Sequence, residues 1–183
     1  HYVSIDTQVL GMLVSRVTGE SLAGYMQRKI WDPLQMEYDA KWLLDSTDME
    51  VALGGLNASM RDYARFGLMY LNSGSFDGQQ IVPAQWVRDS TTPSAPHLFP
   101  GKDNPASASS WGYGYQWWVP EPYEQDFTAA GIYNQYIYVN PKARVVIVKT
   151  SATHGYLAER QLSNDLHIAM FRSIAASAAV PPC

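Results

Sequence analysis

The stretch YIYVNPKARVVIVKT, residues 136–150, decides the fold class of this chain. Aromatic and β-branched residues, which favour strands, fill positions 136–139 and again 145–150. The four residues Asn140-Pro141-Lys142-Ala143 between them form a tight-turn sequence, because asparagine and proline preset turn conformations. Two strands joined by so short a turn pair antiparallel, since a parallel pair needs a much longer crossover. The stretch therefore predicts an antiparallel hairpin.

Helical patterns lie on both sides of this hairpin. Apolar residues recur at three- and four-residue spacing over 6–18, 21–30 and 158–176, which predicts helices with buried apolar faces. The residues of the first helix expected to face inward are Val9, Leu10, Leu13, Val14 and Val17. Those of the last helix are Leu162, Leu166, Ala169, Met170 and Ile174. Ser59 and Asp62 form a capping pair that starts a further helix. Helices, then antiparallel strands, then a helix is the order of an α+β fold.

The chain divides by composition into three expected parts. Residues 1–90 form a helical portion, and residues 111–183 hold the antiparallel strands and the C-terminal helix. Between them, residues 91–110 are rich in Thr, Ser, Pro, Gly and Ala, which predicts a loop of unusual length for a compact domain. Such a loop either covers a functional site or is a plain exposed connection, and the sequence leaves both interpretations open. The aromatic run 113–119 that follows is interpreted as one strand.

Composition limits the classes of partner. The net charge is −4 over 183 residues, with no cluster of Lys and Arg, which argues against nucleic acid or an anionic membrane as partner. No apolar run approaches the roughly 20 residues of a membrane span. Charged residues make up only 16% of the chain, whereas aromatic residues reach 13%. A chain with so many aromatic residues and so few charged ones suggests that a missing partner covers one of its apolar faces.

Neither a metal nor a cofactor is predicted. The four histidines are scattered along the chain, with no helical pair and no cysteine ligands beside them. Gly112-Tyr113-Gly114 lacks the further glycines and the lysine of a phosphate-binding loop. The single cysteine, Cys183, is the last residue, so it is either free or bonded to something outside the chain.

Two short segments are candidates for catalysis. Tyr2 and Ser4 stand at the start of the first predicted helix, where a fixed phenol beside a short polar side chain can move a proton. The alternative is a packed ring and a helix cap. The run Ala129-Ala130-Gly131-Ile132 precedes an aromatic strand, and its small residues would let a backbone N–H approach and stabilise an oxyanion. The alternative there is an ordinary turn into a strand.

Four stretches follow one another in an order that is familiar from one enzyme group. They are Tyr2-Val3-Ser4, Ile30-Trp31-Asp32-Pro33-Leu34-Gln35-Met36, Gly54-Gly55-Leu56-Asn57-Ala58-Ser59 with Asp62 and Ala64-Arg65-Phe66-Gly67, and Trp111-Gly112-Tyr113-Gly114-Tyr115-Gln116-Trp117-Trp118. Together they resemble the C-terminal half of the penicillin-recognising serine hydrolases. That group includes class C β-lactamases, D-alanyl-D-alanine carboxypeptidases, esterases and 6-aminohexanoate-dimer hydrolases. The resemblance runs from Tyr2 to about residue 172. It implies a β-lactamase/transpeptidase-like fold, an antiparallel sheet flanked by helices, of which this chain is a C-terminal fragment.

The resemblance also implies a mechanism, acyl transfer through a serine. In the group, the serine of a Ser-x-x-Lys motif attacks a carbonyl, while its lysine and a motif tyrosine move the protons. The resemblance places Tyr2 as the proton shuttle and Ser4 at the position of the motif's asparagine. It places the backbone N–H of Ile132, which follows Gly131, in the oxyanion hole.

Aromatic and polar residues close to these positions are candidate walls of a substrate pocket. They are Trp117, Trp118, Tyr133, Asn134 and Gln135. Trp117 and Trp118 point to opposite faces of a strand, so at most one of them can face the site. Packing in the core is the alternative for both tryptophans.

Two departures from the group's pattern narrow the expected function. No serine of this chain has a lysine three residues further on, and the chain begins at His1 without a methionine. We therefore expect the nucleophile on an N-terminal segment outside this chain, and expect the chain alone to be inactive. The β-lactamases carry Lys-Thr-Gly where this chain has Ala129-Ala130-Gly131, so the cation and hydroxyl that meet a β-lactam carboxylate are missing. The resemblance thus favours hydrolysis of an amide or ester, as in the 6-aminohexanoate-dimer hydrolase and esterase branch.

Other functions remain as alternatives. One is a β-lactamase or D-alanyl-D-alanine carboxypeptidase, and another is a non-catalytic binding protein on the same scaffold. The expected partners are the N-terminal segment that carries Ser-x-x-Lys and a small-molecule amide or ester. The compartment is left open, with the periplasm or secretion favoured over the cytoplasm.

Overall fold

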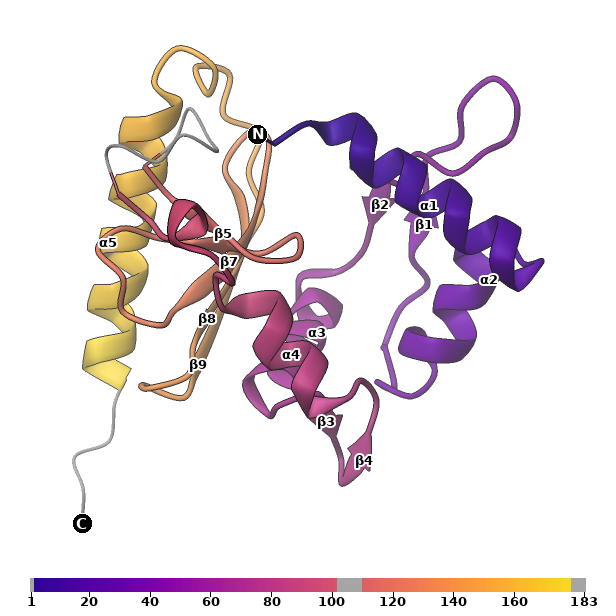
Figure 1. Ribbon diagram of the computed structural model, residues 1–183, viewed down its shortest axis with the longest axis horizontal. Helices are drawn as coiled ribbons and strands as arrows, with labels where there is room; N and C mark the ends of the chain where they lie inside the picture. Colours follow the sequence, from indigo (N-terminus) through magenta and orange to yellow (C-terminus); the bar gives the residue numbers. More distant parts are fainter. Residues whose placement is uncertain (1, 102–109, 179–183) are drawn as a thin grey trace.

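A five-stranded antiparallel sheet organises the C-terminal part of the chain in a computed structural model that describes residues 2–101 and 110–178 (Figure 1). Its strands, in sheet order, are β5 (Gly112–Tyr113), β6 (Trp118–Val119), β7 (Phe127–Gly131), β8 (Gln135–Asn140) and β9 (Val145–Lys149). The pairing of β8 with β9 runs from Tyr136 opposite Lys149 to Asn140 opposite Val145. The hairpin predicted for residues 136–150 is confirmed.

Two segments of this sheet differ from what their sequences predict. The run 113–119 is not one strand, because the backbone N–H of Gly114 bonds the carbonyl of Trp117 at 2.8 Å and turns the chain between β5 and β6. Gln116 in that turn has a φ of 66°, which no strand tolerates. Conversely, residues 127–131 form strand β7, although Ala-Ala-Gly has little strand propensity. Pairing with β6 on one side and β8 on the other imposes the extended conformation.

Helices occupy most of the N-terminal part and both faces of the sheet. They are α1 (Ser4–Thr18), α2 (Leu22–Met26), the π-helical turn η1 (Gln27–Trp31), α3 (Met60–Leu71), α4 (Ala84–Thr91), the 3₁₀ turn η2 (Pro96–Leu98) and α5 (Arg160–Ala178). Two short hairpins accompany them: β1 (Lys41–Trp42) with β2 (Leu56–Asn57), and β3 (Ser75–Phe76) with β4 (Gln79–Gln80). In the segment 91–110, α4 extends to Thr91 and η2 follows, and residues 102–109 lie outside the described part. Cys183 also lies outside it.

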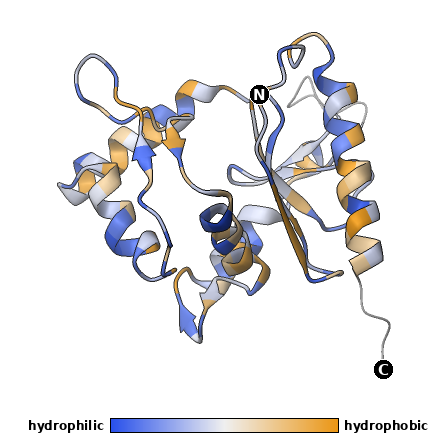
Figure 2. Ribbon diagram, turned by 180° about the vertical axis from the view of Figure 1, so that it is seen from behind, coloured by the Kyte–Doolittle hydropathy of each residue, from blue (hydrophilic) through white to orange (hydrophobic). Residues whose placement is uncertain are grey.

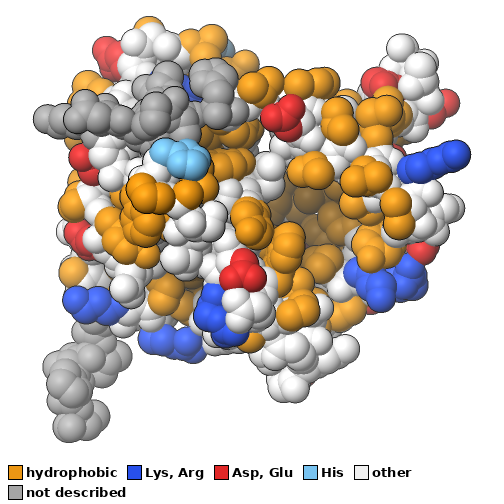
Figure 3. Space-filling model, viewed as in Figure 1, with side chains coloured by type: hydrophobic (Ala, Val, Ile, Leu, Met, Phe, Trp, Pro, Cys, Tyr) orange, Lys and Arg blue, Asp and Glu red, His pale blue; other side chains and the backbone are white. Residues whose placement is uncertain are grey.

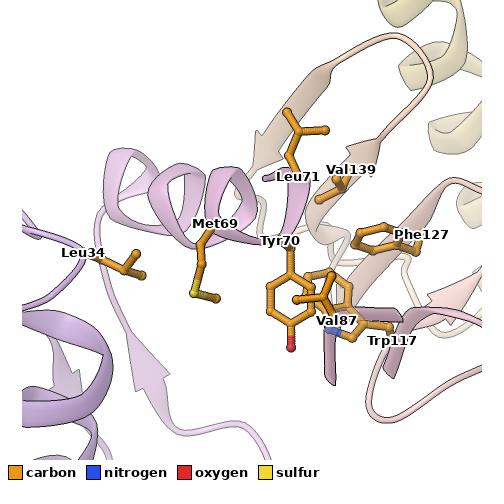
Figure 4. Packing of buried hydrophobic residues seen from close by; sticks show 8 residues of the cluster. All are labelled: Leu34, Met69, Tyr70, Leu71, Val87, Trp117, Phe127 and Val139. Carbon is orange, nitrogen blue, oxygen red and sulfur yellow. The ribbon is translucent and has the colours of Figure 1, made fainter. Parts of the chain in front are cut away.

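The core has two parts, one on each face of the sheet. On one face, α3 directs Tyr70 and Leu71 toward Phe127 of β7 and Val139 of β8, while Met69 lies on the side of Leu34, as the close-up of this cluster shows (Figure 4). On the other face, α5 contributes Ile168 and Phe171 to a cluster of sheet aromatics. Helix, sheet and helix therefore form three layers, and α1 and α2 lie to the side of them (Figure 1).

The apolar faces predicted for the first and last helices are real but point outward. In α1 the five residues expected to be buried are all exposed, Leu13 by 55%. In α5 the buried residues are Asn164, Ile168, Phe171 and Ala175, whereas Leu166 on the predicted face is 61% exposed. Hydrophobic positions show as orange segments along α5 (Figure 2), and apolar side chains lie over α1 beside an apolar hollow (Figure 3). The sequence predicted the apolar stripes correctly but not their direction, since both stripes are exposed among the described residues.

The buried carboxylate of Asp62 ties the loop between η1 and β1 to the start of α3. One of its oxygens accepts the N–H of Glu37 at 2.7 Å, and the other accepts the Ser59 hydroxyl at 2.7 Å. The N–H of Asp62 donates in turn to the Ser59 oxygen at 3.1 Å, so the predicted capping pair is confirmed. The N–H of Tyr38 lies 3.3 Å from the same carboxylate.

Substitution of Asp62 by alanine should lower the free energy of unfolding by about 2–4 kcal/mol, because three hydrogen-bond donors lose a fully buried, charged acceptor. Chemical denaturation of the purified protein measures this loss. The neighbouring Arg61 is the matched control, since its side chain is 79% exposed and its ion pair with Glu37 spans 3.6 Å. Arg61→Ala should cost less than about 1 kcal/mol. Equal losses in the two variants would contradict the role given to Asp62.

Candidate active site

Tyr2 lies against the sheet, in contact with two aromatic rings of β5 and β6. Its ring centroid is 5.2 Å from that of Trp118 and 5.8 Å from that of Tyr113. Tyr113 and Trp118 are themselves cross-strand partners, with ring centroids 4.9 Å apart. Tyr2 remains 38% exposed, so the ring is held on one side while the other side stays accessible. This is the arrangement expected of a positioned but reachable phenol.

Helix α1 is fixed relative to the sheet and to the loop after β1. The Thr7 hydroxyl donates to the side-chain oxygen of Gln116 at 3.1 Å, which joins α1 to the β5–β6 turn. The Gln8 amide donates to the carbonyl of Glu50 at 2.9 Å and accepts the N–H of Ala52 at 2.8 Å. These bonds hold the start of the helix, and with it the backbone of Tyr2, in a defined place.

Tyr113, which contacts Tyr2, is more buried than Tyr2 is. Burial, and then the nearby Tyr2 hydroxyl, raise the pKa of Tyr113 to about 12. Tyr113 therefore keeps its proton at neutral pH and can donate a hydrogen bond. Sequence reasoning did not single out Tyr113, because its pairing with Trp118 follows only from the turn between β5 and β6.

Strand β7 connects Tyr2 to the second candidate segment. Trp118, which touches Tyr2, pairs with Thr128 of β7, and Gly131 lies three residues further along that strand. Three residues of extended chain span about 10 Å. Ile132 follows at the open end of the strand, with its side chain 61% exposed. Tyr2 is thus connected to Gly131 and Ile132 through Trp118 and the paired strand β7.

Gly131 is a glycine that the packing of this chain does not require. A Cβ atom added there would meet only the Cβ of Gln135 at 3.4 Å and its carbonyl oxygen at 3.8 Å, which are ordinary contacts. By contrast, a Cβ on Gly114 would lie 2.0 Å from the carbonyl oxygen of Ser90. A methyl group would therefore fit at Gly131 without displacing any of the described residues.

Ser4 is the first residue of α1 and does not cap it. The capping position is Val3, and no side chain accepts a hydrogen bond from the helix start. The alternative interpretation of Ser4 as a helix cap is therefore wrong. Its exposed side chain lies two residues from Tyr2 on the same segment.

The candidate pocket residues lie in different settings. Trp118 touches Tyr2, whereas Trp117 packs in the core between Tyr70 and Phe127, with ring centroids 4.5 and 5.0 Å away. Core packing describes both tryptophans, because Trp117 is 4% and Trp118 7% exposed, and the two face opposite sides of the sheet. Asn134, expected as a pocket wall, needs correction, because its side chain is only 2% exposed and bonds the Ser163 hydroxyl of α5. Tyr133 and Gln135 are exposed beside it.

The described residues contain no cluster of three or more His, Cys, Asp and Glu side chains placed to hold a metal ion. Within the same residues, no helix has both the length and the apolarity to cross a membrane. A cavity of about 750 Å³ lies along α1, away from Tyr2, and its mainly apolar lining includes Val9, Met12, Leu13 and Met49.

Comparison with known proteins assigns the fold to a family. A family model described as Beta-lactamase matches residues 1–169. The chain belongs to the beta-lactamase family. Over 151 residues it is 29% identical to the 6-aminohexanoate-dimer hydrolase of Paenarthrobacter ureafaciens, an alignment that covers 82% of this chain and 38% of that protein.

Solved structures agree with this assignment. A Bacillus anthracis protein provisionally named a 6-aminohexanoate-dimer hydrolase superposes with a TM-score of 0.79 at 34% identity, over 96% of this chain and 43% of that one. A beta-lactamase from Mycobacterium bovis, at 20% identity and a TM-score of 0.68, shares the fold over 98% of this chain and 64% of that one. This beta-lactamase family chain thus has the β-lactamase/transpeptidase-like fold, is related to hydrolases, and spans about two fifths of its 6-aminohexanoate-dimer hydrolase relatives.

Substitution of Gly131 by alanine should change the free energy of unfolding by less than about 1 kcal/mol, because the added methyl group meets no close neighbour. Gly114→Ala is the matched control and should destabilise the protein by several times as much, since its methyl group would overlap the Ser90 carbonyl. Thermal and denaturant unfolding measure both. A severe loss in Gly131→Ala would show that packing, and not a ligand site, demands the glycine.

Proposed function

We propose that this chain is the C-terminal part of a serine hydrolase that cleaves a small amide or ester through an acyl-enzyme. The nucleophilic serine and its lysine, in a Ser-x-x-Lys motif, would be supplied by an N-terminal segment of the same protein. The chain alone would then be inactive. The observation that carries the proposal is the position of Tyr2 against Tyr113 and Trp118, since Trp118 pairs with the strand β7 that ends at Gly131, directly before Ile132.

Each proposed role depends on a different part of the site. The Tyr2 hydroxyl would pass a proton to the leaving group, with Ser4 beside it on the same segment. The N–H of Ile132 would donate to the developing oxyanion, together with the N–H of the nucleophile, and one such donor is typically worth about 3 kcal/mol in the transition state. Gly131 would leave room for the substrate carbonyl.

The packing of the residues before Gly131 supports an amide or ester substrate over a β-lactam. Ala129 packs against the cluster under α3, and Ala130 against the cluster under α5. Neither position offers a cation or a hydroxyl to a β-lactam carboxylate. The similarity to two proteins named for 6-aminohexanoate-dimer hydrolysis points the same way. We therefore favour a linear amide or a simple ester as substrate.

Three uncovered surfaces support the proposed N-terminal segment. Two are the apolar stripes of α1 and α5, whose residues remain exposed in the described part. The third is β9, an edge strand among the described strands of the sheet, with the apolar run Val145–Val148. An edge of this kind pairs readily with another strand. One segment that adds a strand to β9 and helices to the two stripes would cover all three.

The test uses the complete enzyme and three chromogenic substrates: a short-chain ester, a linear amide and a cephalosporin. We expect the ester or amide to have the highest kcat/KM, and Tyr2→Phe to lower kcat by about 10²–10⁴-fold through loss of proton transfer. Tyr115→Phe is the matched control, because Tyr115 is an exposed tyrosine of the same β5–β6 turn, beside Trp86. Its kcat should equal that of the wild type.

Three outcomes would contradict the proposal. Faster turnover of the cephalosporin would assign the protein to the β-lactamases. Labelling of the isolated chain by a fluorophosphonate would place the nucleophile within these residues. A complete protein that neither reacts with the fluorophosphonate nor turns over any substrate would be a binding protein on this scaffold.

The apolar stripe of α5 gives an independent check on the covering segment. In the complete protein, Leu166→Ala should lower the free energy of unfolding by about 2–4 kcal/mol, as for a buried leucine, and Ile168→Ala by a similar amount. Arg61 of α3 is exposed and lies away from this stripe, so Arg61→Ala is the control and should change stability by less than about 1 kcal/mol. If Leu166→Ala behaves like Arg61→Ala, the stripe is exposed in the complete protein and the proposed segment does not cover it.

A further inference from the structure

The turn that carries Ile132 has an unfavourable backbone conformation. Ile132, Tyr133 and Asn134 join β7 to β8, where Gly131 pairs with Gln135. Tyr133 has a φ of 62° and Asn134 a φ of 68°, both in the left-handed region. Asparagine tolerates this region better than other residues with a side chain, whereas tyrosine does not favour it. Contacts outside the turn must therefore hold it in place.

The side chain of Asn134 provides the first of these contacts. It is buried and points to α5, where the Ser163 hydroxyl donates to its Oδ1 at 3.0 Å. The backbone of Asn134 is held as well, because the Lys149 ammonium on β9 donates to its carbonyl oxygen at 3.1 Å. Burial lowers the pKa of Lys149, as expected of an ammonium partly withdrawn from water. One residue of the turn is thus bonded to a helix and to a neighbouring strand.

Tyr136 extends this anchor to a second residue of α5. Its hydroxyl lies 2.7 Å from the Oδ1 of Asn164 and 3.3 Å from that of Asn134. A phenol has one proton, so the shorter distance is the stronger bond and the longer one a secondary contact. Burial raises the pKa of Tyr136, which keeps that proton available for donation. His167 stacks on the ring of Tyr136 with centroids 5.1 Å apart and keeps it in place.

We propose that Asn134, with Ser163 and Lys149 as its partners, is a positioning residue that fixes the direction of the Ile132 N–H. This inference rests on the proposed function, in which that N–H stabilises the oxyanion. The peptide of Ile132 lies two residues from Asn134 in the same turn, so a rotation of the turn re-aims its N–H. A donor that is aimed before the substrate binds needs no reorganisation during the reaction. Asn134 thus acts on catalysis from the buried side of the turn, without contact with the substrate.

The same hairpin has a second polar anchor, which serves as an internal control. At the far end of β7, the buried Asp126 accepts the Tyr138 hydroxyl at 2.8 Å and two bonds from the Arg172 guanidinium, each at 2.8 Å. This cluster also joins the hairpin to α5, but at the end opposite to Ile132. Tyr138→Phe therefore removes a buried hydroxyl of the same kind without touching the turn.

The experiment compares Asn134→Gly, Ser163→Ala and Tyr138→Phe in the complete enzyme. Glycine accepts the positive φ of residue 134, so Asn134→Gly removes the anchor and leaves the turn conformation accessible. We expect Asn134→Gly to lower kcat by about 10- to 100-fold with KM changed less than about twofold, and Ser163→Ala to show a smaller loss in kcat. Ser163→Thr, which keeps the hydroxyl donor, should retain most of the wild-type kcat. Tyr138→Phe should lower the melting temperature and leave kcat unchanged.

Hydrogen exchange of the peptide 131–135, followed by mass spectrometry, gives a readout that does not depend on activity. It should become faster in Asn134→Gly and Ser163→Ala but not in Tyr138→Phe. Wild-type exchange and wild-type kcat in Asn134→Gly would overturn the proposal. An equal kcat loss in Tyr138→Phe would also overturn it, since the effect would then be one of general stability. If the wild type hydrolyses none of the substrates, the proposed function fails, while the exchange data still decide whether Asn134 holds the turn.

Discussion

The antiparallel pairing of β7 with β6 and β8 is the constraint on which the candidate site depends. A strand that begins with Phe127 and ends with three small residues has little reason to be extended by itself, but ladders on both sides fix it. That pairing sets Trp118 beside Thr128 and thereby gives the ring of Tyr2 its place on the sheet. It also sets the end of β7 at Gly131, where the chain must turn. The residues of the candidate site are more than a hundred positions apart in the sequence, and their placement depends on the pairing of β7.

The two faces of the hairpin are used differently along its length. Its core positions pack apolar groups against α3 on one face and α5 on the other. Its two ends are joined to α5 by buried polar groups, Asn134 near the turn and Asp126 at the other end. Hydrogen bonds of this kind specify a unique geometry where apolar packing alone would permit sliding. The role that we propose for the β7–β8 turn, to hold the Ile132 N–H in one direction, requires support of this kind.

Much of the fold followed from local signals in the sequence. The hairpin 136–150 was evident from strand residues around Asn140-Pro141, and the start of α3 from Ser59 and Asp62. Features that depend on residues distant in the sequence were not predicted correctly. The break in 113–119 depends on Gly114 lying against Ser90, and the outward direction of Leu166 depends on which face of α5 meets the sheet. Periodicity shows that a helix has an apolar face, but not what covers it.

For the candidate site, the sequence by itself determined which residue types were present and in what order. Tyr2 at a helix start, Gly131 before Ile132 and the lack of any Ser-x-x-Lys can all be read without coordinates. Only the tertiary structure decided that Tyr2 meets Trp118, that Trp117 belongs to the core and that Asn134 is turned inward to α5. The physical reason is that residue type and short-range spacing are local properties of a chain. Contacts across a sheet are set by strand register and by the burial of whole faces.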